Sequence, residues 1–242
     1  MTRLDPRLLL QGYATGIFPM ADSRDADELF WVEPRNRAVI PLHRFHMSRS
    51  LRRRLRSGEF SVTCDRDFAG VIAACADRPE TWITADLERA MLALHGSGHA
   101  HSIEVWKDDE LVGGVYGVKL GRAFFGESMF SRRTDASKVA LAWLVARLKV
   151  GNFALLDCQF ITEHLASLGA ISIPRETYVA LLSVLLGGGG VGTPSGPVEM
   201  LGEVPAGPPD FFALDRLLEL AGAAGAGGPA GYVISQLLGQ TS

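Results

Sequence analysis

Three polar side chains stand within apolar segments of the chain, where each could take part in chemistry. Asp157 and Gln159 interrupt the apolar run 153–160, and Glu127 lies in the apolar run 123–130. Residues two apart on a strand project from the same face of a sheet. If 153–160 is a strand, a carboxylate and an amide lie beside one reacting centre, which suits proton transfer or the orientation of a nucleophile.

Glu127 has two interpretations that the sequence leaves open. A buried carboxylate needs a partner, and Arg132 and Arg133 follow closely in the chain, so Glu127 could form a structural ion pair with one of them. The other interpretation, a role in binding substrate, depends on the family resemblance described below. The neighbouring Ser128 is not part of a G-x-S-x-G nucleophile elbow, and no ordered Ser, His and acid triad can be assigned, which argues against acyl-serine chemistry.

A second chemically distinct region is the basic segment 43–56, HRFHMSRSLRRRLR. Four of its arginines fall three or four residues apart and would share one face of a helix. The whole chain has a net charge of only −3, so this positive charge is local. A nucleic-acid phosphate backbone would be a natural partner, and a solvated arginine-rich face is the alternative.

The segments that carry these residues alternate between strand and helix patterns. Short apolar runs separated by polar or glycine turns predict a three-stranded meander. Asp135 as an N-cap and Gly151 as a stop delimit a helical pattern, and an apolar strand and a short helix follow. The predicted order is strand, strand, strand, helix, strand, helix over 102–106, 111–120, 123–130, 136–150, 153–160 and 161–168.

Length and composition bound the class of protein. A chain of 242 residues with 47% hydrophobic content can form one large or two small globular domains. Its apolar runs are shorter than the roughly 20 residues of a membrane span, and its start has no signal-peptide character, so we expect a cytoplasmic protein. Cys64, Cys75 and Cys158 are too widely spaced for a disulfide scaffold or a zinc site. Cys158 should face the opposite side of the sheet from its two polar neighbours.

Several sequence motifs in a fixed order then point to one family. They are GIFPM (16–20), WVEPRNRAVIP (31–41), TWIT (81–84), HAHSIEVW (99–106), GESMFSRRTDASK (126–138) and LLDCQFITEHLASLGA (155–170). Together they cover roughly residues 8–186, and the set resembles the leucyl/phenylalanyl-tRNA–protein transferases. No single one of these motifs would suffice, since a stretch such as GGVYG could belong to any glycine-bearing strand.

The resemblance implies an α+β fold with a mixed α/β sheet. An acetyltransferase-like (GNAT-type) catalytic domain is expected at 96–186, with a smaller N-terminal α+β domain at 1–95 that carries the basic segment. The composition then changes to Gly and Pro, which predicts a flexible C-terminal extension over 187–242. Two short apolar pieces, 211–220 and 232–238, interrupt it, and the second could dock back on the body.

The activity that the resemblance implies is aminoacyl transfer from aminoacyl-tRNA to a protein. Leu or Phe, with Met as a further candidate, would pass to the free α-amine of proteins that begin with Arg or Lys and mark them for N-end-rule degradation. Asp157, Gln159 and Glu127 would form the catalytic group, with Asp157 either accepting a proton or orienting Gln159. No metal or other cofactor is implied, because the ester of aminoacyl-tRNA is already activated.

The same resemblance assigns binding residues. An apolar pocket for the transferred side chain would be lined by Val115, Met129, Leu144, Leu148 and Leu156. Met20 and Trp82 match positions that cover the terminal adenosine, although many relatives have Trp where this chain has Met20, so aromatic stacking is lost there. Contacts with the acceptor stem of the tRNA would come from Arg44, Arg49, Arg52, Arg53 and Arg56.

Two other functions were weighed against this one. A small-molecule acyl-CoA acetyltransferase on the same fold would need a glycine-rich, pyrophosphate-binding loop before the helix, and SRRTDASK (131–138) does not supply it. A non-enzymatic RNA-binding module would explain the basic segment. It would leave Asp157, Gln159 and Glu127 without a role.

Overall fold

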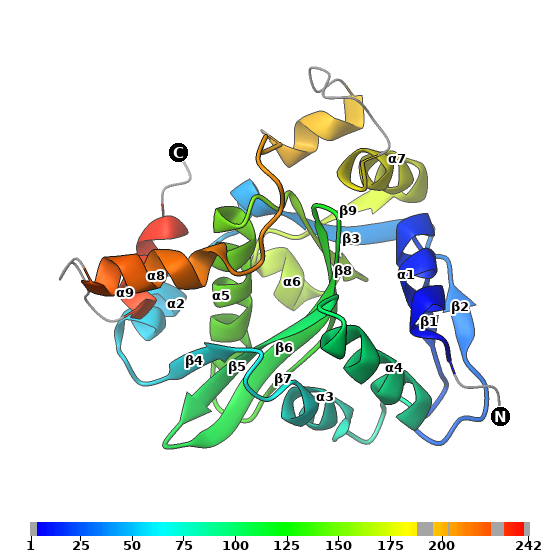
Figure 1. Cartoon of the computed structure of the whole chain (residues 1–242), viewed down its shortest axis with the longest axis horizontal. Coiled ribbons are helices and arrows are strands. Elements are labelled where there is room, and N and C mark those ends of the chain that lie inside the picture. Colours follow the sequence, from blue (N-terminus) through cyan, green and yellow to red (C-terminus); the bar gives the residue numbers. More distant parts are fainter. Residues whose placement is uncertain (1–3, 188–195, 203, 224–229, 240–242) are drawn as a thin grey trace.

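A computed structural model of the chain describes residues 4–187, 196–202, 204–223 and 230–239, and its centre is a seven-stranded sheet (Figure 1). The strand order is β4-β5-β6-β7-β8-β3-β9, and β7 and β8 are the parallel pair in an otherwise antiparallel sheet. A separate hairpin is formed by β1 and β2. The strands are β1 Phe18–Met20, β2 Phe30–Val32, β3 Asn36–Pro41, β4 Ser61–Cys64, β5 Ala100–Lys107, β6 Glu110–Leu120, β7 Ala123–Ser131, β8 Leu155–Gln159 and β9 Ile171–Pro174.

Helices pack against both faces of this sheet, because both faces are apolar. Helix α5 packs on the face that carries the first core cluster, and α1, α3, α4 and α7 pack on the other. The α-helices are α1 Pro6–Thr15, α2 Arg49–Arg56, α3 Phe68–Ala76, α4 Ala85–Gly96, α5 Ala136–Val150, α6 Glu163–Ser167, α7 Arg175–Leu185, α8 Ala213–Ala223 and α9 Ala230–Leu237, with 3-10 helices η1 Leu42–Arg44 and η2 Gly196–Leu201.

The predicted strand and helix order from the meander to the short helix is confirmed as β5, β6, β7, α5, β8 and α6. One local detail was wrong. Asp135 stands before α5, but its backbone is left-handed (φ 68°) and its side chain caps no backbone N–H. Its carboxylate instead accepts a hydrogen bond from Lys138 Nζ at 3.0 Å.

The mixed α/β class is confirmed, and the sheet extends across the boundary expected between residues 95 and 96. Strands β3 and β4 come from the predicted N-terminal domain, yet β3 pairs with β8 and β9, and β4 pairs with β5. β3 is buried along nearly its whole length because strands flank it on both sides. The two predicted parts therefore share one sheet.

The two apolar pieces expected to interrupt the extension over 187–242 are helical and packed against the body of the protein. The two apolar pieces form α8, with Phe211 just before it, and α9. Phe211, Leu214 and Ile234 are almost fully buried in the core on the α5 side, so apolar burial fixes these helices despite the glycine-rich sequence around them. Residues 188–195, 203, 224–229 and 240–242 of the predicted extension lie outside the described part of the chain.

Within the described ranges, no helix combines the length and the hydrophobicity that crossing a bilayer requires.

Candidate active site

Asp157 lies near the end of β8, fully buried, and is held by a buried arginine from the neighbouring strand β3. Arg37 Nε lies 2.9 Å from both carboxylate oxygens, and a terminal nitrogen of the same guanidinium lies 2.8 Å from Oδ2. Both side chains expose 1% or less of their surface. Burying two charges costs desolvation free energy, which only a close ion-pair geometry can offset. The forked guanidinium provides that geometry by contacting both carboxylate oxygens.

Two further donors complete the surroundings of Asp157. Its Oδ1 accepts the backbone N–H of Gln159 at 2.7 Å, and its Oδ2 accepts the hydroxyl of Tyr178 from α7. Both oxygens therefore have donors from the protein itself. The carboxylate is locked in one orientation, and it fixes the backbone of Gln159, whose φ of 62° is unusual for a residue other than glycine.

The electrostatics of this group keep the arginine charged and the tyrosine neutral. Burial alone would lower the pKa of Arg37, but the charge of Asp157 and its hydrogen bond, together with Tyr178 and Glu127, raise that pKa overall. Burial raises the pKa of Tyr178 well above its usual value, and the adjacent carboxylate raises it further. Tyr178 therefore remains a hydrogen-bond donor at neutral pH.

Glu127 reaches the same region from β7 through a β-bulge. In the pairing of β6 with β7, Tyr116 faces Ser128 and Gly117 faces Gly126, so Glu127 is the extra residue. Bulges re-aim a side chain relative to the regular alternation of a strand. The carboxylate of Glu127 accepts a hydrogen bond from Gln159 Nε2 at 3.1 Å, which brings the three predicted catalytic residues together.

The structural ion pair considered for Glu127 is not formed. Arg132 lies 3.6 Å from Asp77, and Arg133 lies 3.5 Å from Glu110, both at the surface. Glu127 is instead buried with one oxygen, Oε2, that has no hydrogen-bond partner among the described residues.

The protonation of Glu127 is poised near neutral pH. Burial raises its pKa to about 7, and the charge of Asp157 contributes to the rise, although Tyr13 and Arg37 partly oppose it. Tyr13 from α1 and Tyr116 from β6 are fully buried beside it and keep raised pKa values for the same primary reason, burial. A carboxyl group with this pKa can exchange a proton under physiological conditions.

An apolar pocket of about 100 Å³ opens beside Glu127. Pockets for drug-sized ligands measure roughly 300–1,000 Å³, so this one suits a single side chain. Four of the five predicted pocket residues line it, namely Val115, Met129, Leu144 and Leu156. Its other lining residues are Gly126, Glu127, Ser128, Leu141, Cys158 and Leu165.

The structure places the fifth predicted pocket residue, Leu148, away from this pocket. It is completely buried in the core on the α5 side and does not line the pocket. Leu148 lies one turn after Leu144 on α5, and that turn packs into the interior rather than along the pocket wall.

Cys158 confirms the expected alternation along β8. Its side chain lines the apolar pocket together with Leu156, whereas Asp157 points toward Arg37 and Tyr178. Burial raises the pKa of the Cys158 thiol well above its usual range, and the charge of Asp157 adds to this effect. A thiol that stays protonated is a poor nucleophile, so Cys158 is part of the wall.

Met20 and Trp82 lie apart from this pocket. Both are partly buried and pack against the second core cluster, on the opposite face of the sheet from α5. Met20 pairs with Phe30 across the β1–β2 hairpin, and the aromatic ring of Phe30 is about half-exposed.

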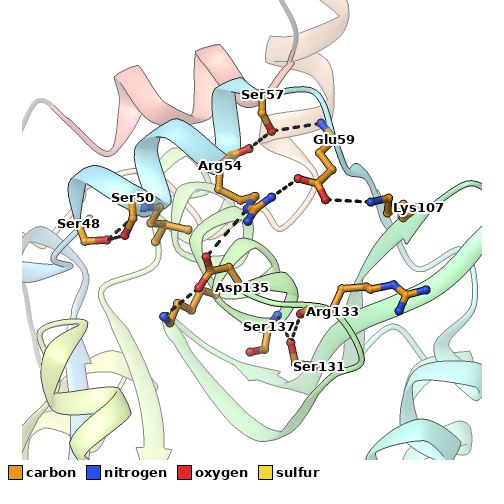
Figure 2. A network of polar contacts seen from close by, with 12 residues as sticks. Ser48, Ser50, Arg54, Ser57, Glu59, Lys107, Ser131, Arg133, Asp135 and Ser137 are labelled. Carbon is orange, nitrogen blue, oxygen red and sulfur yellow. Dashed lines mark hydrogen bonds and ion pairs between the residues drawn. The ribbon is translucent and has the colours of Figure 1, made fainter.

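The basic segment forms helix α2, as its spacing predicted. Ser48 caps the helix by accepting the N–H of Leu51 at 3.2 Å, and Leu51 and Leu55 are buried. Arg54 points along the protein surface between two carboxylates: it pairs with Glu59 and lies 4.0 Å from Asp135 (Figure 2). Its charge is therefore largely balanced.

The five predicted tRNA-binding arginines differ from Arg54 because all are exposed. None of the five has a carboxylate within 4 Å among the described residues, and four of them are Arg44, Arg49, Arg52 and Arg53. The fifth, Arg56, donates from Nε to the hydroxyl of Ser235 at 2.7 Å. The outer face of α2 thus presents unbalanced positive charge.

Sequence reasoning missed Arg37, Tyr178 and Tyr13. Arg37 had a visible signal, since it stands in the run RAVIP, where a charged residue precedes four apolar ones on a strand that becomes buried. A buried charge requires a partner. Tyr178 and Tyr13 had no comparable signal, because a tyrosine on an apolar helix face is ordinary core.

Comparisons with known proteins identify the family of this chain. The family model described as "Leucyl/phenylalanyl-tRNA protein transferase" matches residues 39–183, and the model of its N-terminal domain matches residues 2–35. A relative from Rhizorhabdus wittichii is 55% identical over 248 residues and covers the whole of both chains. Relatives from Zymomonas mobilis (63% identical, 74% of this chain and 68% of the relative) and Cereibacter sphaeroides (62% identical, 76% and 86%) bear the same name, leucyl/phenylalanyl-tRNA–protein transferase. The chain is an aminoacyltransferase and belongs to the leucyl/phenylalanyl-tRNA–protein transferase family.

Proposed function

We propose that this aminoacyltransferase moves Leu or Phe, with Met as a further candidate, from aminoacyl-tRNA to the free α-amine of proteins that begin with Arg or Lys. The product carries a new peptide bond and is marked for N-end-rule degradation. The observation that supports this most directly is the small apolar pocket, lined by Met129, Leu144 and Leu156, that adjoins the pair formed by Glu127 and Gln159. Apolar walls suit an aliphatic or aromatic side chain, and the flexible Met129 can adapt to either.

In the proposed reaction, the acceptor amine attacks the ester carbonyl that joins the amino acid to the terminal ribose of the tRNA. The new C–N bond forms, the C–O bond of the ester breaks, and the ribose hydroxyl leaves with a proton. Because Gln159 donates from Nε2 to Glu127, its Oε1 faces away from that bond and can accept a hydrogen bond from the attacking amine. Holding both reactants in this geometry supplies much of the rate.

Asp157 acts in this scheme as the group that orients Gln159. Its two oxygens already accept hydrogen bonds from Arg37, Tyr178 and the backbone N–H of Gln159, and it has no exposed surface. A carboxylate so surrounded is a poor proton acceptor for an incoming amine. Glu127 is better suited to receive the ammonium proton, because its pKa lies near 7 and its Oε2 is unpartnered among the described residues.

The tRNA would bind through the phosphates of its acceptor stem on the outer face of α2. Helix α2 packs against α5, and Leu141 and Leu144 of α5 line the pocket, so one helix connects the basic face with the candidate site. Positive side chains on such a face position the substrate without reading its sequence. Met20 and Trp82 would lie near the terminal adenosine, as the family resemblance implies.

We also infer that the unit from β5 to β8 is acetyltransferase-like. The antiparallel meander leads through α5 to β8, which is parallel to β7. The two parallel strands pair only between Ala123–Phe125 and Leu155–Asp157, although β7 continues to Ser131. The pocket adjoins the part of β7 that no longer pairs with β8, as a site between two diverging strands would.

The test is transfer of radiolabelled phenylalanine from charged tRNA to a protein with N-terminal arginine. The matched control is the same protein with an acetylated N-terminus, and a second acceptor begins with a neutral residue. We expect label only on the free amine of the first protein. Label on neither acceptor, with leucyl-tRNA inactive as well, would contradict the proposed substrates.

A further inference from the structure

The C-terminal extension lies beyond residue 183, where the match to the main family model ends, and it packs against the basic helix. In Figure 1, α9 (red) lies beside α2 (cyan), although the two are far apart in the sequence. The contact is close, because a Cβ atom placed on Gly231 would lie 2.0 Å from the carbonyl oxygen of Leu55. Only glycine permits this approach of the two helices.

Two residues of α9 hold the guanidinium of Arg56. Its Nε donates to Ser235 Oγ at 2.7 Å, and the guanidinium carbon lies 4.7 Å from the centre of the Tyr232 ring. Ser235 is buried and is itself oriented by donating to the carbonyl of Tyr232 at 2.8 Å. Arg56 nevertheless remains exposed, with its guanidinium held against α9 by these two contacts.

This contact orients a positive charge without balancing it. The sequence of α9, AGYVISQL, contains no acidic residue. Arg54 on the same helix α2 provides the contrast, because Glu59 and Asp135 lie against its guanidinium (Figure 2). The extension therefore leaves the charge of Arg56 available to an anion.

A second anchor fixes the extension to the body of the protein. Arg147 of α5 is 2% exposed, and both its terminal nitrogens donate to the carboxylate of Asp215 on α8 at 2.6 Å. The same guanidinium donates to the carbonyl of Phe211 at 2.9 Å, and the ring of Phe211 stacks on His101 at 4.1 Å. The extension is thus part of the folded core.

We propose that the extension positions Arg56 for a phosphate of the bound tRNA, with Tyr232 and Ser235 as the positioning residues. This inference rests on the proposed contact between α2 and aminoacyl-tRNA. Immobilising a long side chain on binding is costly, and an arginine already held in place avoids part of that cost. Loss of the two contacts should weaken tRNA binding by about two- to ten-fold.

The experiment measures the Kd of Phe-tRNA, together with kcat and KM for transfer, in the full-length protein. The variant combines Tyr232→Leu with Ser235→Ala. We expect Kd and KM to rise by about two- to ten-fold with kcat unchanged. Arg56→Ala should produce a loss at least as large, and adding it to the double variant should cause little further loss, since all three side chains act through one contact.

Three controls separate positioning from general damage. Tyr232→Phe keeps the ring beneath the guanidinium and should bind as the parent does. Arg53→Ala, on the same helix, should weaken binding additively with the double variant. Leu220→Ala changes an exposed side chain of α8 and should change nothing.

The inference is overturned if the double variant binds Phe-tRNA like the parent, or if its loss simply adds to that of Arg56→Ala. It is also overturned if Arg56→Ala has no effect. In that last case, the Kd of Phe-tRNA for Arg53→Ala shows which proposal has failed. Weaker binding by Arg53→Ala would leave α2 as the tRNA contact and overturn only the role of Arg56. Normal binding by both single variants would also overturn the proposed contact between α2 and tRNA.

Discussion

The charged side chains around Asp157 are buried and paired, whereas those on the outer face of α2 are exposed. Arg37 and Asp157 are buried and paired with each other through short contacts, whereas Arg52 and Arg53 are exposed and have no carboxylate within 4 Å among the described residues. Buried pairs are little screened by salt and depend strongly on geometry, while exposed charges act at longer range and are screened. The first region should determine the rate of the chemical step, and the second should determine tRNA affinity.

The strongest test of this comparison removes the buried cation. Arg37→Ala leaves Asp157 buried without its main partner, so we expect the free energy of unfolding, measured by urea denaturation, to fall by about 3–5 kcal/mol. The control is Arg24→Ala, which breaks a surface pair with Glu88 and should cost about 1 kcal/mol or less. A similar small loss in both variants would show that the buried pair is no stronger than a surface pair.

Asp157→Asn tests whether the buried group determines rate rather than affinity. The amide keeps the shape but loses the charge that binds Arg37, so the Gln159 side chain should shift. We expect kcat for phenylalanyl transfer to fall by about 100-fold, with the Kd of Phe-tRNA within about two-fold of the parent. Asp109→Asn, at an exposed turn, is the control and should leave both values unchanged. An unaffected kcat in Asp157→Asn would remove this residue from the site.

Glu127 should make the stability of the buried region depend on pH. Its pKa is raised to about 7 in the folded protein, above the usual 4.5, so the folded state holds the proton more tightly. The stabilisation is fully present below about pH 4.5 and is lost as the pH rises through 7. We expect the parent protein to lose about 2–3 kcal/mol of unfolding free energy relative to Glu127→Gln between pH 5 and pH 8. Parallel pH profiles for the two proteins would exclude this titration.

The smallest expected effect concerns the exposed face. Arg52→Ala with Arg53→Ala should weaken Phe-tRNA binding and reduce the slope of log Kd against log salt concentration by about 1 for each arginine. Arg54→Ala is the matched comparison on the same helix and should reduce the slope less, because its charge is already balanced by Glu59 and Asp135. Binding of the parent that does not depend on salt would contradict phosphate contacts.

The sequence was most informative where structure depends on neighbouring residues. The meander was predictable because its turns, at Lys107–Glu110 and Gly121, separate short apolar runs. The face of α2 followed from arginine spacing alone. The pocket residues came from the family resemblance, and the one that does not line the pocket, Leu148, is an apolar side chain that could equally have been core.

The sequence was least informative where distant segments meet. Arg37 and Asp157 are 120 residues apart, and no local pattern connects them. The bulge that turns Glu127 toward Gln159 depends on how β6 and β7 pair, which hydrophobic alternation does not specify. The glycine-rich composition after residue 186 predicted flexibility. Composition alone cannot show that Arg147 contacts α8 and that Leu55 contacts α9, and these contacts join both helices to the rest of the protein.

The packing of α9 on α2 has a practical consequence for recombinant protein. Gly239, two residues after the end of α9, lies beside Arg52, because a Cβ atom placed on it would be 3.5 Å from a terminal nitrogen of that guanidinium. An affinity tag fused shortly after Gly239 would therefore begin close to the exposed arginines of α2. An acidic tag would compete with nucleic acid for them, and a polyhistidine tag would add charge as the buffer is acidified. Purification through an N-terminal tag, or removal of the C-terminal one, gives affinities that belong to the enzyme alone.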